Sequence, residues 1–257
     1  INSHAKAFYR HPGFDLCGGV DSNLKNRNIF TSKYGIKSYS NVIQAIEEIK
    51  PKIVVISTPT KTHYEIIQKV VEKSYVEIIL CEKPLSNQLS EAKEINQLCE
   101  NNGVSLYVNY NRRCDPGVIN IRDRINKELM RQPIKGVCWY SKGLLNNGSH
   151  FINLLEFWLG DYVSNKKLNT GRSFPKNDFE PDFEIKFKKG KVVFQALWEE
   201  YFSHNSVELF CKNGRLRYED SGLKIVWNSI ISDKVFNGYK KINEVDEVIP
   251  NDMLNST

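Results

Sequence analysis

The chain has 257 residues, 40% of them hydrophobic and 26% charged, and its formal net charge is +6. This length and composition are typical of a globular protein with one large or two ordinary domains. The sequence has no run of about 18 apolar residues, and its basic residues are interleaved with acidic ones, so we expect neither a membrane nor a nucleic-acid partner.

Six cysteines are scattered along the chain, with no C-x-x-C pair and no histidine at metal-ligand spacing. Disulfide frameworks and zinc sites both require cysteines in characteristic pairs or clusters. We therefore expect free thiols in a reducing, cytoplasmic setting, and no metal site.

The stretch 3–109 alternates between predicted helices and buried strands. Its clearest strand is Ile53–Ser57, a short run of mostly β-branched residues. Further strands are expected at 14–21, 76–81 and 104–109. Helices are expected at 3–9, at 40–49, after the turn 58–63, and from residue 86 or 87 to about 101. Strands that alternate with helices predict a Rossmann-like, doubly wound parallel sheet in an α/β fold.

An acidic residue, Asp21, ends the first of these strands. A dinucleotide-binding fold places at such a position the carboxylate that accepts hydrogen bonds from the adenosine ribose. Asp21 can instead cap the following helix, because a carboxylate accepts from the first backbone N–H groups of a helix. Both roles remain open at this point.

The strand ending at Cys81 runs directly into Glu82, Lys83 and Pro84. In an open parallel sheet, ligands bind beyond the carboxyl ends of the strands. The sequence therefore places an ammonium group at the mouth of a cleft, on a backbone stiffened by proline. An isolated Glu-Lys pair more often ends a strand in solvated charges.

The second half of the sequence has a different pattern of predicted elements. Helices are expected at 118–130 and 147–159, and strands at 134–141, 183–188, 192–198, 207–211, 215–218 and 223–227, which together predict an α+β domain with an open, mostly antiparallel sheet. We place the domain boundary after residue 113, with a dinucleotide-binding domain at 1–113 and a substrate and oligomerisation domain at 114–257. The alternating residues Val192, Phe194, Ala196 and Trp198 predict an exposed sheet face through which a homodimer or homotetramer forms.

Four stretches in this order resemble the Gfo/Idh/MocA family of oxidoreductases. They are Val54–Pro59 with His63, Cys81–Pro84, Asn111–Arg113 with Asp115-Pro116, and Gly148–His150 running to Phe157–Gly160. The resemblance covers nearly the whole chain and becomes weaker after about residue 170. It implies a Rossmann domain followed by a domain built on an open sheet, and hydride transfer between a nicotinamide cofactor and a sugar or polyol carbon.

The resemblance also assigns roles to residues. It implies that Lys83 and His150 are catalytic, since an imidazole suits acid and base work near neutral pH. The cofactor-binding residues are expected to be Asp21, Thr58, Pro59, His63, Glu82 and Lys83, and the substrate-binding residues Tyr110, Asn111, Arg113 and Asn146. Asp21 favours NAD over NADP, because its charge repels a ribose 2′-phosphate, although Lys25 and Arg27 lie close by in the sequence.

Structural roles compete with several of these assignments. His63 is equally suited to a place in the first turn of its helix, and His150 to a core or capping position. Arg113 suits a substrate carboxylate or phosphate, but it can equally pair with Asp115 or Glu156.

The sequence departs from the family pattern in two places. Family members begin with a strand and a glycine-rich turn that lets the backbone approach the diphosphate, and here the sequence starts near the helix that follows them. Either the first dozen or so residues are missing or the cofactor is not held in the usual way; Asp21 and the Thr58-Pro59 turn favour the first. We also expect that the sequence stops early at its other end, since 253–257 resembles the start of a further helix.

The second departure is Asn146, four residues before His150, where the family usually carries Asp. Residues four apart share one face of a helix, so both can reach one substrate carbon. Asn binds a sugar hydroxyl but cannot relay a proton. Three functions follow from the resemblance: a sugar or nucleotide-sugar dehydrogenase or reductase, a non-redox member such as an NAD-assisted glycosidase or a dehydratase-like enzyme, and a catalytically silent dinucleotide-binding relative.

Overall fold

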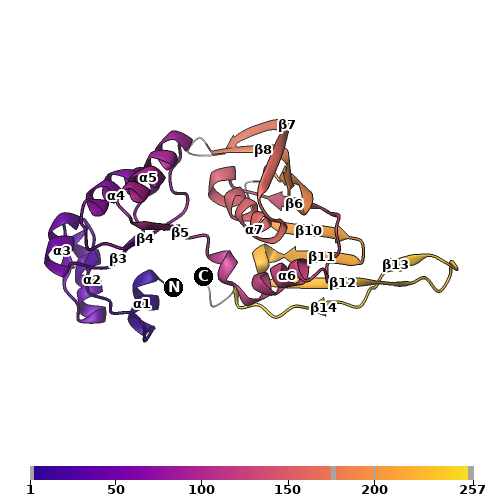
Figure 1. The fold of residues 1–257 in the computed structure, drawn as a ribbon, viewed down its shortest axis with the longest axis horizontal. Coiled ribbons are helices and arrows are strands. Elements are labelled where there is room, and N and C mark those ends of the chain that lie inside the picture. The colour runs from indigo at the N-terminus through magenta and orange to yellow at the C-terminus, as the bar shows by residue number, and fades with distance from the viewer. Residues whose placement is uncertain (1–2, 175–177, 200, 254–257) are drawn as a thin grey trace. The chain divides into compact units, whose positions relative to one another are not determined.

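The computed structural model describes residues 3–174, 178–199 and 201–253, and its contacts divide the chain into two units, 1–109 and 110–257 (Figure 1). The division falls four residues before the boundary expected from the sequence. The reason is that Arg112 donates to the Tyr218 hydroxyl at 3.0 Å and Arg113 donates to Asn153, so both arginines bond within the second unit.

The first unit alternates helices with parallel strands. Its elements are α1 (His4–Arg10), β1 (Gly19–Val20), α2 (Leu24–Tyr34), β2 (Ser38–Tyr39), α3 (Val42–Ile49), β3 (Ile53–Ile56), α4 (His63–Val71), β4 (Ile78–Cys81), α5 (Leu89–Asn101) and β5 (Ser105–Val108). All strand pairs are parallel, and they form two ladders, β1–β2 and β3–β4–β5. The Rossmann-like fold predicted for this half is confirmed.

Apolar side chains on both sides of the β3–β4–β5 ladder explain why these short runs become strands. Ile79 at the centre of β4 is fully buried, and it packs in one cluster with Ile67 of α4 and Ile95 of α5. The carboxyl ends of β3 and β4 therefore lie at one edge of a rigid sheet, where the chain turns out into Thr58 and Glu82.

The second unit is built on one large sheet. Its elements are α6 (Pro116–Asn126), β6 (Ile134–Tyr140), a π-helical turn (Leu144–Gly148), α7 (Ser149–Leu159), β7 (Tyr162–Phe174), β8 (Asp178–Phe187), β9 (Gly190–Ala196), β10 (Ser206–Cys211), β11 (Gly214–Glu219), β12 (Lys224–Ser232), β13 (Lys240–Ile242) and β14 (Glu247–Val248). The strand order is β13-β12-β11-β10-β6-β9-β8-β7, with β14 also paired to β12. Among the described strands of this large sheet, only the β6–β9 pair is parallel, so the predicted open, mostly antiparallel sheet is confirmed.

Helices α6 and α7 cover one face of this sheet, and the core lies between them and the strands. The expectation that Val192 and Phe194 form an exposed face is wrong. Both are fully buried in this core, because the pleat of β9 directs them toward the helices. The alternate residues, such as Val193, point to the opposite face, which no helix covers in the described part of the chain. Trp198 lies beyond β9 and donates its indole N–H to the Glu180 carbonyl at 3.0 Å.

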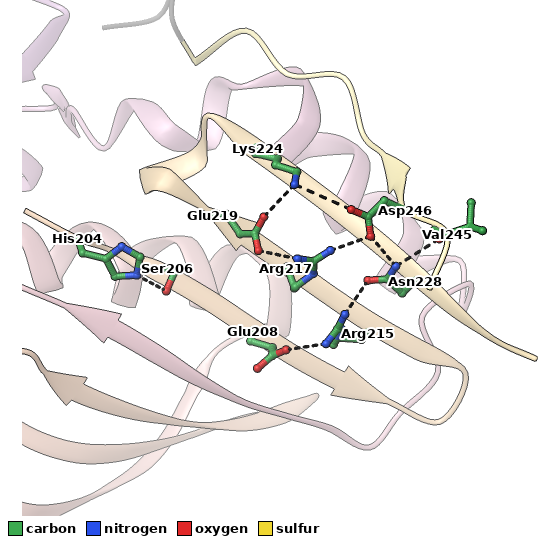
Figure 2. Close-up of polar contacts among 10 residues, drawn as sticks. All are labelled: His204, Ser206, Glu208, Arg215, Arg217, Glu219, Lys224, Asn228, Val245 and Asp246. Atoms are coloured by element: carbon green, nitrogen blue, oxygen red, sulfur yellow. Dashed lines mark hydrogen bonds and ion pairs between the residues drawn. The ribbon is translucent and has the colours of Figure 1, made fainter. Parts of the chain in front are cut away.

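A network of charged and polar side chains holds the segment 243–248 against β12 (Figure 2). Arg217 of β11 pairs with Glu219 at 2.8 Å and with Asp246 at 2.7 Å, and Asn228 donates to Asp246 at 2.9 Å. These bonds hold the segment over one end of the sheet face that no helix covers, which we call the open face. Strands β6, β8 and β9 have no such cover in the described residues.

None of the described helices has the length and apolar character needed to cross a bilayer. The helix expected to start at 253–257 falls mostly on residues 254–257, which lie outside the described residues.

Candidate functional site

Asp21 lies at the carboxyl end of β1, where its side chain orders the turn into α2. Its Oδ1 accepts from the backbone N–H of Asn23 at 2.7 Å, and its Oδ2 accepts from the Asn26 amide at 3.0 Å. The helix cap is Asn23 and not Asp21, because the Asn23 side chain accepts from the N–H of Lys25. A carboxylate accepts about four hydrogen bonds. Asp21, which is only partly buried, therefore keeps capacity for ribose hydroxyls.

The turn after β3 is organised by a buried imidazole. His63 is only 1% exposed, and its Nε2 lies 2.9 Å from the Thr58 carbonyl oxygen while its Nδ1 lies 3.1 Å from that of Leu85. Thr58 also accepts at its hydroxyl from Thr62, whose hydroxyl lies within reach of the Pro59 carbonyl. His63 thus has the structural role in the first helical turn that the sequence left open, and it links the loop after β3 to the loop after β4.

Glu82 follows β4 and is held as a carboxylate. It accepts from His4 at 2.7 Å, from the Asn109 amide at 2.8 Å and from the backbone N–H of Lys83 at 3.2 Å. The bond from His4, helped by those from Asn109 and Lys83, lowers the pKa of Glu82 to about 2. The backbone of Lys83 is therefore fixed on both sides, by Glu82 at its own N–H and by His63 at the Leu85 carbonyl.

In the second unit, His150 lies in the first turn of α7. The ring of Tyr110 meets the His150 ring edge-on, with 5.6 Å between ring centroids. Asn146 lies one turn earlier in the π-helical turn, and its amide donates to the Lys142 carbonyl at 3.1 Å. Asn111 is in a 3₁₀ turn, Asn111–Cys114, that follows Tyr110 directly.

Arg113 is already engaged with α7. Its Nε donates to Asn153 at 2.5 Å, its guanidinium lies 3.7 Å from Glu156, and it stacks over the Phe157 ring at 5.3 Å. Burial is the main cause of a lowered pKa for this guanidinium. The Glu156 pairing weighed from the sequence is thus present. The Asp115 pairing is replaced by a cap, since Asp115 accepts from Gly117 at 2.8 Å.

The predicted residues therefore form two groups. Thr58, Pro59, His63, Glu82 and Lys83 come together at one edge of the first unit. Tyr110, Arg113 and His150 come together beside α7 in the second unit. Because Lys83 and His150 belong to different units, their action on one substrate carbon stays a prediction.

Sequence reasoning missed several residues that hold these groups in place. His4 and Asn109 contact Glu82 from 78 and 27 positions away, and no local pattern signals such contacts. Asn153 was detectable, because it lies three residues after His150 and hence on the same helix face.

Comparison with known proteins shows a family likeness for the first unit. Residues 2–110 match the profile of the GFO_IDH_MocA oxidoreductase family, described as having an NAD-binding Rossmann fold. This stretch, 109 of the 257 residues, is similar to the NAD-binding domain of the Gfo/Idh/MocA family.

Two curated relatives match parts of the chain. The uncharacterized oxidoreductase C115.03 of Schizosaccharomyces pombe is 26% identical over 167 residues, which cover 57% of this chain and 45% of the relative. The scyllo-inositol 2-dehydrogenase (NAD(+)) of Bacillus subtilis is 33% identical over 101 residues, 39% of this chain and 29% of the relative. The matches thus span less than half the length of either relative.

Solved structures of Gfo/Idh/MocA type share the fold over most of the chain. The WlbA dehydrogenase of Bordetella pertussis, crystallised with NADH and UDP-GlcNAcA, superposes with a TM-score of 0.70 at 14% identity. The superposition covers 84% of this chain and 69% of that one. At this identity the likeness shows the fold alone.

The residues of the candidate site suit a dinucleotide more than a metal ion. Asp21 offers a carboxylate with spare acceptor positions at the end of β1. Thr58 and Pro59 lie beyond the end of β3, the region where an open parallel sheet binds its ligand. Across residues 3–174, 178–199 and 201–253, no three His, Cys, Asp or Glu side chains gather closely enough to hold a metal.

Proposed function

We propose that the protein is an NAD-dependent dehydrogenase or reductase that acts on a hydroxyl or keto carbon of a sugar, polyol or nucleotide-linked sugar. The observation that carries the proposal is the setting of His150. It is a titratable imidazole next to a phenol and near a guanidinium, in a chain of an NAD-binding oxidoreductase family. Such a group moves a proton to or from a carbinol oxygen at neutral pH.

The chain's own residues have distinct tasks in this reaction. When bound, the nicotinamide supplies the hydride chemistry. Asp21 accepts from the ribose hydroxyls, Thr58 and Pro59 line the dinucleotide, and Glu82 fixes the backbone that carries Lys83. Lys83 donates to the reacting oxygen as a cation, while His150 takes or returns the carbinol proton.

The substrate-side residues follow from the second unit. Tyr110 limits the rotation of the His150 ring, because it meets that ring edge-on. Asn146 and Asn111 are suited to sugar hydroxyls, since an amide both donates and accepts. Arg113 presents its guanidinium to a carboxylate or phosphate beside its bonds to Asn153.

The substrate class rests on the relatives. One acts on scyllo-inositol with NAD, and one was crystallised with NADH and a UDP-linked sugar acid. The preference for NAD over NADP rests on Asp21, whose charge disfavours a 2′-phosphate. Arg27 does not offset this charge freely, because its guanidinium donates to the backbone carbonyls of Asp21 and Ser22 at 2.8 and 3.0 Å.

The test is turnover with NAD or NADP and a panel of inositols, hexoses and UDP-sugars, followed by the absorbance of the reduced nicotinamide. We expect turnover with NAD, and a loss of roughly 10²–10⁴-fold in kcat for Lys83→Ala and for His150→Ala. The matched controls are Lys52→Ala and His11→Ala, which alter exposed residues. Unchanged kcat in Lys83→Ala and His150→Ala would overturn the proposal.

Asn146 favours a second candidate, a catalytically silent dinucleotide-binding protein, because it lacks the charge that the family usually carries at this position. Cofactor binding with no turnover on any sugar supports that candidate. Product release without net cofactor reduction would instead support a non-redox glycosidase or dehydratase-like activity.

We also propose that the protein forms a homodimer or homotetramer through the open face of its large sheet. Trp139 of β6 is 39% exposed on this face and Phe210 of β10 is 45% exposed. Apolar surface of this kind is commonly buried between subunits. Light scattering of Trp139→Asp should show a smaller species than the unsubstituted protein, and an unchanged mass would contradict this interface.

A further inference from the structure

The backbone just before His150 is held by two carboxylates from β8. Asp178 accepts at Oδ1 from the N–H of Leu145 and at Oδ2 from the N–H of Asn146, both at 2.9 Å. Glu180 accepts at Oε1 from the N–H of Gly143 at 3.0 Å. The first N–H groups of a helix have no partners within the helix. Here three of them are satisfied by residues more than thirty positions away.

The local backbone is shaped to receive Asp178. Gly143 has φ +94°, which disfavours side chains, and a Cβ at this position would lie 2.0 Å from the Asp178 Oδ2. Glu180 is fully buried and pairs with Arg172 at 2.8 Å, so the strand that carries Asp178 is itself fixed. The carboxylate therefore lies in a space that only glycine leaves open.

We propose that Asp178 is a positioning residue for His150, an inference that rests on the proposed function. Asn146 lies one helical turn before His150, so fixing the N–H groups of Leu145 and Asn146 fixes the turn that carries the imidazole. A negative charge at the start of a helix is also favoured by the helix dipole.

This arrangement gives a reason for Asn146. An aspartate at position 146 would set a second carboxylate close to Asp178, and like charges at short range disfavour one another. The chain thus supplies negative charge at this turn from β8 and keeps position 146 neutral.

The test compares Asp178→Asn with Asp182→Asn in the intact protein. Asp182 is a matched control, because it lies on the same strand and accepts from the N–H of Ala196 at 2.9 Å, away from α7. We expect Asp178→Asn to lower kcat at least tenfold with an NAD dissociation constant within twofold. Asp182→Asn should keep kcat within twofold, even where both variants lose similar thermal stability.

Moving the carboxylate from position 178 to position 146 gives a second measurement of kcat, which a purely structural cap would not affect in this way. Asn146→Asp alone should lower kcat, and Asn146→Asp combined with Asp178→Asn should recover at least a third of the lost activity. If Asp178→Asn keeps kcat within twofold, or the double variant is no better than Asp178→Asn, the inference is wrong. Asp178→Ser, which retains one acceptor, replaces the Asn variant if that variant does not fold.

A second readout separates this inference from the proposed function. The NMR signal of the His150 ring, assigned with His150→Gln, should shift or broaden in Asp178→Asn and stay in place in Asp182→Asn. If the unsubstituted protein turns over no substrate, the proposed function fails, and this signal still decides the role of Asp178. An unchanged His150 signal in Asp178→Asn would overturn the inference.

Discussion

The most deeply buried side chains that anchor the backbone near the reactive residues are of opposite kinds in the two units. In the first unit, the carbonyls of Thr58 and Leu85 face the ring nitrogens of His63. In the second, N–H groups before His150 are bound by Asp178 and Glu180. The loops beyond parallel strands expose carbonyls and need a donor, whereas a helix start exposes N–H groups and needs an acceptor. The polarity of each anchor therefore follows from the type of backbone end that it holds.

The largest expected loss of unfolding free energy comes from removing the carboxylate anchor of the second unit. Glu180→Gln removes the charge that pairs with Arg172 and accepts from Gly143. Removing one partner of a buried pair costs about 3–5 kcal/mol, and the partial exposure of Arg172 brings this to about 3 kcal/mol. Urea unfolding measures it. Glu184→Gln is the control, since Glu184 pairs with Lys191 nearer the surface, and an equal loss there would contradict the special role of Glu180.

The next largest loss of unfolding free energy comes from removing the imidazole anchor of the first unit. His63→Ala removes the ring whose nitrogens face the carbonyls of Thr58 and Leu85 and opens a cavity, which should cost about 2–3 kcal/mol in unfolding free energy. His11→Ala, at an exposed histidine, should change it by less than about 0.5 kcal/mol. Similar losses in both variants would show that His63 holds neither loop.

A smaller effect on stability, which depends on pH, comes from Glu82 of the first unit. The pKa of Glu82 is lowered to about 2, first by the bond from His4. A carboxylate with a lowered native pKa stabilises the fold above its unfolded pKa and loses this contribution as pH falls through the native value. Glu82→Gln should therefore cost about 1 kcal/mol near pH 6, a value discounted because the side chain is 32% exposed. The difference from the unsubstituted protein should vanish as pH falls toward about 2. A pH-independent difference would contradict this assignment.

The smallest effect concerns a pair that anchors neither loop. Lys52 and Glu77 lie 2.9 Å apart, and both side chains are more than half exposed. Lys52→Ala should change the unfolding free energy by less than about 0.5 kcal/mol, and added salt should reduce even that. A loss of unfolding free energy comparable to that of His63→Ala would contradict the distinction between buried anchors and surface ion pairs.

The sequence predicted the elements that carry a strong apolar pattern. Ile53–Ser57 and the run ending at Cys81 became β3 and β4, because buried parallel strands are continuously apolar. It did not predict β7, whose thirteen residues are mostly exposed and therefore show no alternation. The face of β9 was assigned wrongly, because alternation shows that two faces differ but not which one the helices cover.

The candidate site was predicted in its chemistry and not in its supports. Lys83 and His150 follow from motifs within a few residues. Asp178 lies 32 residues from Asn146, and the strand pairing that brings them together is not encoded in any short pattern. For the same reason, the helix that carries His150 was predicted to start at Asn147, whereas helical structure begins at Leu144.

The parallel pairing of β6 with β9 has a consequence for the order of assembly. The connection between these two strands contains α7, β7 and β8, so the middle of the sheet closes only after a chain loop of about fifty residues has been drawn together. Contacts of such long sequence separation form slowly. A ribosome-bound chain that has emerged only through Leu159 already contains His150 but lacks both of its carboxylate anchors, so we expect the imidazole to reach its working orientation late in folding.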